Sequence, residues 1–322
     1  MNDEWRKVMP ECGDLQQDAI LSASVLNWIK NQCGGSWDIY HICPLKGGVS
    51  SVVYEIQLQR NEEHAIWVLR QYTDRAWLAE EPDVVLHETS ALNIVHRNGM
   101  NSPNWIASDP EGSHCGEPSV LMTRLSGEVI LMPDDLTSWL AGIAQELALL
   151  HRKKIEPFPW SYYSYIDPSQ FRLPGWTTRP KAWEEIARII KEPPPNCTPR
   201  FIHRDYHPGN VLWERGRVSG IVDWVNACLG PPGIDVGHCR VNLVQLHGLE
   251  AADHFLDLYF DHVQGEQGIE YSAYWDMLTL ASYVDVELMV YQGWVDLGVT
   301  HLHKDLLAAR LDEYAESLLR RS

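Results

Sequence analysis

The peptides HRDYHPGN (residues 203–210) and IVDW (residues 221–224) decide the fold of this chain. An apolar run, residues 211–213, follows the first peptide, and a second one, residues 218–222, overlaps the start of the second peptide. The polar residues 214–217 separate the two runs. Two short apolar runs around a polar turn predict a β-hairpin, because both strands can then bury one face. The polar residues of the two peptides are therefore expected at one end of this hairpin.

Asn210 and Asp223 are the chemistry-bearing residues at this hairpin end. Pairing of residue 213 with residue 218 places 210 opposite 221, within two residues of Asp223. An amide oxygen and a carboxylate held together form an oxygen-only site, the kind that Mg²⁺ prefers. Asp205 lies five residues before Asn210 on the connecting loop, close enough to act as a general base beside the metal. The residues alone thus predict Asn210 and Asp223 as metal ligands and Asp205 as the catalytic residue.

This constellation resembles the family of aminoglycoside phosphotransferases and choline-kinase-like small-molecule kinases, which are relatives of the protein kinases. The octapeptide matches the catalytic-loop pattern H-R-D-x-x-x-x-N in full, and the resemblance extends over about residues 40–240. It implies that Asp205 takes the proton of a substrate hydroxyl and that Asn210 and Asp223 hold Mg²⁺ on the phosphates of ATP, with GTP as the alternative nucleotide.

The resemblance also implies an α+β, protein-kinase-like fold with two lobes. A small antiparallel-sheet lobe over residues 1–122 would bind the nucleotide. Residues 123–127 would form the hinge, and a larger, mostly helical lobe over residues 128–322 would carry catalysis and substrate binding. The apolar patterning agrees, because it predicts strands at 39–42, 49–58 and 65–70 and mostly helix from about residue 236 onward.

The N-terminal lobe supplies the expected nucleotide contacts. A glycine pair stands where a kinase has its phosphate-covering loop, and glycine lets backbone N–H groups approach phosphate closely. Arg70 ends the third strand, where kinases carry a lysine, and Glu88 is its expected partner because a carboxylate on an apolar helix face needs a cation. Backbone groups of the hinge would bind the adenine edge. The candidate nucleotide-binding residues are Gly47, Gly48, Ser50, Ser51, Arg70, Glu88, Met122 and Arg124.

Two departures from the protein-kinase pattern disfavour a protein substrate. Asp223 is followed by Trp-Val, without the glycine of D-F-G, and the peptide GPPGIDVG (residues 230–237) stands in place of an activation segment. In the small-molecule kinases an aspartate in such a peptide braces the catalytic loop, and Asp235 is expected to do so here. His203 is expected to support the loop by hydrogen bonding, whereas His207 is expected either to support it or to contact phosphate or substrate.

The charge balance restricts the partners. Asp and Glu number 44 against 26 Lys and Arg, so the formal net charge is −18. So acidic a chain repels phosphate backbones and anionic lipid, and we expect a cationic small molecule as partner, with neither nucleic acid nor membrane. The seven cysteines include no C-x-x-C pair and the first residues show no signal-peptide pattern, so we expect reduced thiols and a cytoplasmic location. The sequence does not define an oligomeric state.

Asp285 and Glu287 are the candidate substrate residues, together with His207. Both acids interrupt an apolar helical run over residues 277–290, and carboxylates in such a run need a cation or water. We therefore expect a cationic, hydroxylated acceptor, with an aminoglycoside-like amino sugar, and hence an antibiotic-resistance enzyme, as the first hypothesis. The alternatives are a metabolic kinase for choline, homoserine, methylthioribose or a sugar, and a non-catalytic nucleotide-binding pseudokinase.

Overall fold

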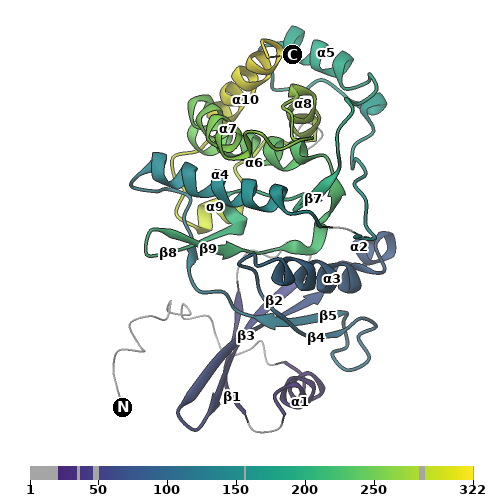
Figure 1. Cartoon of the computed structure of the whole chain (residues 1–322), viewed down its shortest axis with the longest axis vertical. Helices are drawn as coiled ribbons and strands as arrows, with labels where there is room; N and C mark the ends of the chain where they lie inside the picture. Colours follow the sequence, from purple (N-terminus) through teal and green to yellow (C-terminus); the bar gives the residue numbers. More distant parts are fainter. Residues whose placement is uncertain (1–20, 35–36, 46–50, 156, 283–286, 322) are drawn as a thin grey trace. The chain divides into compact units, whose positions relative to one another are not determined.

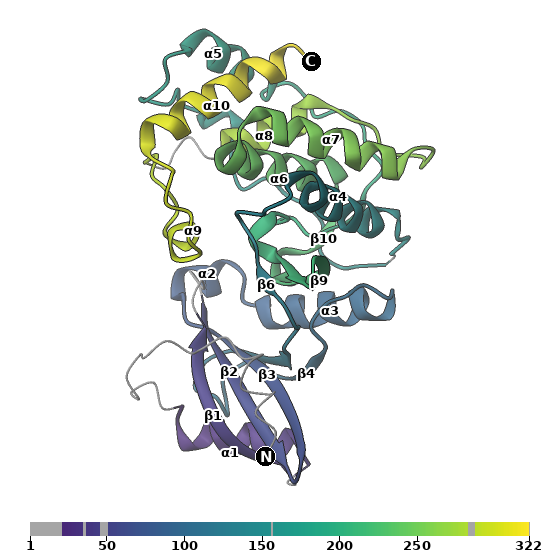
Figure 2. The ribbon, with the colours of Figure 1, turned by 90° about the vertical axis from the view of Figure 1, so that its left-hand side faces the viewer.

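The structure is a computed structural model that describes residues 21–34, 37–45, 51–155, 157–282 and 287–321 (Figures 1 and 2). It divides into two compact units. The first unit comprises the chain up to Leu86 together with Trp105–Arg124, and the second comprises His87–Asn104 together with the chain from Leu125 onward. The second division falls inside the expected hinge, but residues 87–104, which we had assigned to the N-terminal lobe, pack with the C-terminal unit.

The first unit is built on one antiparallel sheet. Its strands run in the order β1-β2-β3-β5-β4, and every neighbouring pair is antiparallel. The strands are β1 (Asp38–Leu45), β2 (Ser51–Arg60), β3 (Glu63–Tyr72), β4 (Trp105–Asp109) and β5 (Ser119–Thr123). The three strands predicted before residue 75 are therefore confirmed, and the short, buried strand β5 lies between β3 and β4.

Helix α1 (Ala23–Gln32) packs on this sheet. Its buried side chains Val25, Trp28 and Ile29 repeat at helical spacing and join one core cluster with Ile56 and Leu69 from the sheet. Such an apolar stripe is what an amphipathic helix buries against a sheet face. The short helix α2 (Arg75–Glu80) follows β3 in the chain. Asp74 lies directly before this helix, and its carboxylate accepts two backbone N–H groups of the first turn.

Helix α3 (Val84–Arg97) ends two residues before Gly99. Gly99 adopts a left-handed φ of +72° and its N–H donates to the carbonyl of His96, an ending that glycine permits without steric cost. The face with Val85, Glu88 and Leu92 is buried, and Glu88 retains only 1% of its accessible surface. The expected burial of the Glu88 carboxylate on this apolar helix face is thus confirmed.

The second unit is mainly helical, with helix α6 at its centre. Nearly all residues of α6 are buried, and it packs against α7, α8 and α10, while α4 packs along α7 (Figure 2). The helices are α4 (Leu136–Arg152), α5 (Pro180–Ile189), α6 (Pro232–His247), α7 (Leu249–Val263), α8 (Ala273–Ala281), α9 (Gln292–Asp296) and α10 (Lys304–Leu319). Helix α5 lies in a proline-rich stretch that we expected to be irregular. Pro180 stands at its first turn, where proline is compatible with a helix.

Two small sheets complete the second unit and carry the catalytic-loop peptides. One has the order β6-β8-β9 and the other pairs β10 with β7. Their strands are β6 (Glu128–Val129), β7 (Arg200–Ile202), β8 (Val211–Glu214), β9 (Arg217–Ile221) and β10 (Cys228–Gly230). The 3₁₀ turn η3 (Pro208–Asn210) leads into β8, and the 3₁₀ turn η4 (Trp224–Asn226) follows β9.

One cysteine differs from the expectation that all thiols are reduced. Cys43 on β1 is disulfide-bonded, so the prediction of reduced thiols throughout is wrong at this position. Five others are free thiols: Cys33, Cys115, Cys197, Cys228 and Cys239. Among the helices of the described residues, none combines the length and apolar character that crossing a bilayer requires.

Candidate active site

The β8–β9 hairpin brings Asn210 and Asp223 to one end, as predicted. Trp213 pairs with Val218 as expected, and an irregularity between Leu212 and Trp213 then shifts the register by one residue. As a result the carbonyl of Asn210 accepts the N–H of Val222 at 3.0 Å. Asn210 therefore lies opposite the residue directly before Asp223, one position from the register that the sequence analysis assumed.

Asp223 has an unusual backbone. Its φ of +68° and ψ of +57° lie in the left-handed region, where a residue with a Cβ is strained by about 1–2 kcal/mol. The chain turns here from β9 into η4, and Trp224, directly after it, is fully buried. A strained residue that the surrounding packing holds in place often marks a functional position.

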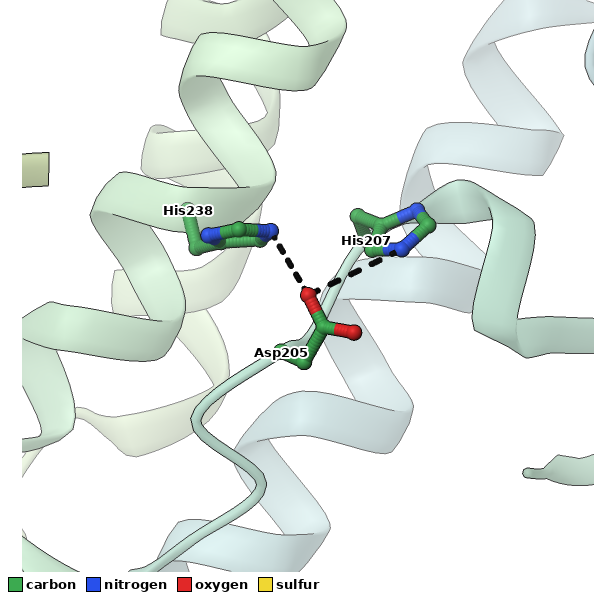
Figure 3. A group of neighbouring side chains, drawn as sticks. All are labelled: Asp205, His207 and His238. Carbon is green, nitrogen blue, oxygen red and sulfur yellow. Dashed lines mark ion pairs between the residues drawn. The ribbon is translucent and has the colours of Figure 1, made fainter. Parts of the chain in front are cut away.

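Asp205 is held by side chains on both of its carboxylate oxygens. His238 of α6 places Nε2 3.0 Å from Oδ1, and Asn210 donates its amide N–H to Oδ2 at 3.3 Å and to the Asp205 carbonyl at 2.9 Å. His207 Nε2 lies 3.9 Å from the same Oδ1, beyond hydrogen-bonding distance (Figure 3). Asp205, Asn210 and Asp223 thus belong to one small region of the second unit.

The surroundings of Asp205 favour its charged form. Burial would raise the pKa of this carboxyl, but the hydrogen bond from His238 and the nearby histidines outweigh burial and hold the pKa well below its usual range. Burial lowers the pKa of His207 to about 4, against the opposing attraction of Asp205. At neutral pH the site therefore contains an ionised Asp205 beside a neutral His207.

Asp235, at the beginning of α6, braces the catalytic loop as expected. Its buried carboxylate accepts the backbone N–H of His203 at 2.8 Å and of Arg204 at 2.6 Å. His151 of α4 adds a third contact at 3.1 Å and pairs on its other ring nitrogen with the hydroxyl of Tyr259 at 2.7 Å. A buried carboxylate is costly without such partners, and here it fixes the loop before Asp205.

His203 and Arg204 tie the same loop to its neighbours. His203 Nε2 lies 2.9 Å from the carbonyl of Val222, so the predicted supporting role of His203 is confirmed. Arg204 has a left-handed φ of +69°, and its guanidinium lies over the rings of Tyr163 and Tyr165, 4.2 Å and 3.8 Å from their centroids. These contacts tie the catalytic loop to Val222, Tyr163 and Tyr165.

The residues at the hairpin end fit a magnesium ion. The amide nitrogen of Asn210 donates to Asp205, which leaves the amide oxygen for another partner, and Asp223 follows two residues after the end of the neighbouring strand β9. Amide and carboxylate oxygens without nitrogen or sulfur donors are the ligand set that suits this hard cation. Asn210 and Asp223 would therefore hold it.

The cluster of Asp205, His207 and His238 has a different character. By composition it could hold a transition metal, because the three ligand atoms lie within 4.8 Å of one another. However, Nδ1 of His207 accepts the N–H of Gly209 at 3.1 Å, so neutral His207 carries its hydrogen on Nε2, the atom that faces Asp205. In this tautomer Nε2 of His207 offers no lone pair to a metal, and the contact that the cluster makes is the hydrogen bond between His238 and Asp205.

The predicted nucleotide-binding residues lie mostly in the first unit. Ser51 begins β2, Arg70 is half-buried on β3 between Val53 and Val120, and Gly47, Gly48 and Ser50 lie outside the described residues. Glu88 belongs to the second unit, so its pairing with Arg70 stays a prediction.

Met122 and Arg124 occupy the end of β5 and the residues after it. Met122 pairs with Val68, and the N–H of Arg124 donates to the carbonyl of Ile66 at 3.1 Å. The guanidinium of Arg124 pairs with Glu55 at 2.6 Å. The backbone N–H and the guanidinium of Arg124 thus both bind partners within the first unit. Contact of Met122 and Arg124 with a nucleotide stays a prediction.

The structure does not place Glu287 in a buried helix. Helix α8 ends at Ala281, so the helical run that we expected over residues 277–290 does not form. The side chain of Glu287 is 80% exposed and lies 3.9 Å from Lys304, while Asp285 lies outside the described residues. Glu287 therefore needs no bound ammonium group to offset burial.

Sequence reasoning missed His238 and His151. His238 follows Asp235 by three residues on α6, so both project from one helix face toward the catalytic loop. That spacing was the available signal. His151 was assigned only to the basic end of α4, although it is fully buried.

Comparison with solved structures defines the class of fold. The chain aligns with macrolide 2'-phosphotransferase MphH from Brachybacterium faecium with a TM-score of 0.54 and 16% identity, over 88% of this chain and 97% of that one. It aligns with a thermostable mutant of aminoglycoside phosphotransferase APH(4)-Ia, in complex with AMP-PNP and hygromycin B, with a TM-score of 0.58 and 15% identity, over 93% and 98% of the chains. The fold is therefore that of the protein-kinase-like phosphotransferases.

Residues 41–270 match the Phosphotransferase enzyme family, and the chain belongs to this family. Among curated proteins it is similar to homoserine kinase of Beijerinckia indica subsp. indica, with 25% identity over 221 residues. This match covers 63% of the chain and 65% of the relative, so the chain spans a little under two thirds of that relative's length. The resemblance to small-molecule kinases that the catalytic-loop peptide carries is thereby confirmed.

Proposed function

We propose that this protein is an ATP- and Mg²⁺-dependent phosphotransferase that transfers the γ-phosphate to a hydroxyl group of a small molecule. The observation that carries the proposal is the contact of Asn210 with Asp205, at the hairpin end where Asp223 follows. This arrangement supports a carboxylate base next to an oxygen-only metal site. A non-catalytic pseudokinase is disfavoured, because loss of one of these three residues would be its expected mark.

Asp205 acts on the acceptor hydroxyl. Since its pKa lies well below the usual range, Asp205 is ionised at neutral pH and can accept a hydrogen bond from that hydroxyl. The same low pKa makes it a weak base in the ground state, so it first orients the hydroxyl. It takes the proton as the new O–P bond forms, the bond between the γ-phosphorus and the bridging oxygen of ADP breaks and the hydroxyl becomes more acidic, in keeping with a loose phosphoryl-transfer transition state.

Asn210 and Asp223 would hold Mg²⁺, which neutralises charge on the nucleotide phosphates when bound. Asn210 has a second task, because its amide nitrogen donates to Asp205. One side chain therefore links the metal site to the base, and displacement of Asn210 would disturb both. ATP as the donor is supported by the nucleotide complexes of the structural relatives, which include an AMP-PNP complex.

We propose an amino alcohol as the acceptor. Homoserine, which the curated relative's name gives as its substrate, carries a hydroxyl and an ammonium group, and aminoglycosides share both features. The net charge of −18 favours an acceptor with an ammonium group. Because the curated relatives are more similar in sequence than the structural ones, we test homoserine before aminoglycosides.

An acceptor screen tests this proposal. The purified protein is incubated with MgATP and, separately, with homoserine, choline, an aminoglycoside, methylthioribose and a neutral hexose. ADP release is followed against a control without acceptor, and phosphorylated product is identified by ³¹P NMR. We expect acceptor-dependent ADP release with an amino alcohol. Release only with alcohols that lack an ammonium group would refute the acceptor class. Absence of both MgATP binding and acceptor-dependent release would refute the phosphotransferase.

A further inference from the structure

We infer that His238 is a positioning residue that orients the carboxylate of Asp205 through a hydrogen bond from its Nε2–H group. The inference rests on the proposed function, in which Asp205 receives the acceptor hydroxyl. His238 lies on helix α6, outside the catalytic-loop peptide of residues 203–210.

The geometry separates His238 from the neighbouring histidine. His238 Nε2 lies 3.0 Å from Asp205 Oδ1, which is an ordinary hydrogen-bond length, whereas His207 Nε2 lies 3.9 Å from the same oxygen. The ring centroids of the two histidines are 5.6 Å apart, so the imidazoles lie next to each other over one carboxylate oxygen (Figure 3). His238 is therefore the histidine that bonds to Asp205.

The two oxygens of Asp205 have donors from different parts of the chain. His238 reaches Oδ1 from helix α6, and Asn210 reaches Oδ2 from η3. Two donors on opposite oxygens fix the rotation of a carboxylate about its Cβ–Cγ bond. Each oxygen keeps a second lone pair, so the acceptor hydroxyl can still bind. The contact from Asn210 is the longer one at 3.3 Å, so His238 provides the better-defined restraint.

Helix α6 makes this restraint rigid. His238 stands three residues after Asp235, whose carboxylate holds the loop backbone at His203 and Arg204. The same buried helix thus anchors the main chain before Asp205 and the side chain of Asp205 itself. A base held within a few tenths of an ångström of its productive position is expected to matter, because misplacement by about 1 Å can cost about 10²-fold in rate.

Two substitutions separate hydrogen bonding from packing. His238→Phe keeps a ring and removes the donor, whereas His238→Gln removes the ring and keeps an N–H group near the Nε2 position. We expect His238→Phe to lower kcat by about 10- to 100-fold with KM for MgATP unchanged, and His238→Gln to retain most of kcat. His247→Gln, on the same helix and bonded to the carbonyl of Leu131, is the matched control and should leave kcat unchanged.

Either of two kinetic results would overturn the inference: wild-type turnover in His238→Phe, or equal loss in His238→Gln and His238→Phe. The melting temperature of each variant is measured in parallel, so that loss of folding is not read as loss of positioning.

The tautomer of His238 gives a test that does not need activity. In ¹⁵N-histidine-labelled protein, ring-nitrogen shifts distinguish Nε2–H from Nδ1–H, and spectra of His238→Gln and His207→Gln assign the two signals. We expect both histidines to be Nε2–H near pH 7.5, and the His238 Nε2–H proton to shift in Asp205→Leu. An Nδ1–H tautomer at His238, or direct Zn²⁺ ligation by its Nε2, would contradict the inference even in a protein that phosphorylates nothing.

Discussion

The carboxylate of Asp235, buried at the beginning of α6, accepts the backbone N–H of Arg204 at 2.6 Å. Arg204 at this point has a left-handed φ of +69°, a conformation that is costly for a residue with a Cβ. The charged hydrogen bond offsets that cost and sets the direction in which the chain enters Asp205. The position of the proposed base therefore depends on a helix that begins 27 residues later in the sequence.

Replacement of Asp235 tests this dependence. Asp235→Asn places an amide N–H against one of the two backbone donors and weakens the contact with His151. We expect a loss of about 1.5–3 kcal/mol in the free energy of unfolding, the range for hydrogen bonds to a charged group, together with reduced kcat. Urea unfolding measures the first and an ADP-release assay the second. Asp261→Asn, at an exposed position of α7, is the control. Equal stability of Asp235→Asn and wild type would contradict the bracing role.

The metal ligands are tested by calorimetry. Asp223→Ala should abolish Mg²⁺-dependent ATP binding, because it removes the charged ligand, and Asn210→Ala should weaken binding, because it removes a neutral one. Asp257→Ala on the exposed face of α7 should bind as wild type does. The assignment fails if Asp223→Ala and wild type bind MgATP with the same affinity and the same dependence on Mg²⁺.

Arg70 is expected to contact the nucleotide from β3. Arg70→Ala should weaken MgATP binding, and Arg70→Lys should restore part of it if the charge matters more than the planar guanidinium. Arg60→Ala, which removes an exposed ion pair with Glu63 in the same sheet, is the control for loss of a surface charge. Unchanged binding and turnover in Arg70→Ala would show that this strand does not contribute the phosphate-binding cation.

Stability should fall in mildly acidic solution because of His207. Burial holds its folded-state pKa at about 4, below the ordinary value of 6.5. Below pH 6.5 the unfolded chain therefore binds a proton that the folded chain does not, so the contribution of His207 is complete above pH 6.5 and declines as the pH falls toward 4. Urea unfolding at pH 7.5 and pH 5 should show a smaller pH-dependent loss for His207→Gln than for wild type. Equal losses would contradict the assigned pKa shift.

The sequence predicted the hairpin end well because its determinants are local. Two apolar runs around a polar turn specified the pairing of Trp213 with Val218, and the spacing then brought Asn210 and Asp223 together. The one-residue shift after Leu212 was not predictable, since a strand irregularity depends on the ladder that surrounds it. His238 was missed for a related reason, because its contact with Asp205 joins a helix to a distant loop.

The substrate region was predicted less well because apolar composition alone does not define burial. Residues 277–290 read as one buried helix, but α8 stops at Ala281, and Met289 and Glu287 are exposed. Exposed apolar residues are common on protein surfaces, so a run of them does not require a core. The acceptor class consequently rests on charge and relatives rather than on assigned contact residues.

Single-turnover phosphoryl transfer by Asp205→Asn is the decisive test of Asp205 as the base. This change keeps the shape of the side chain and removes the base, which typically contributes about 10²–10⁴-fold. With saturating MgATP and the acceptor identified in the screen, we expect phosphorylated product to form at least about 10²-fold more slowly than in wild type, with MgATP affinity nearly unchanged. Product formation at the wild-type rate in Asp205→Asn would contradict the assignment of Asp205 as the base.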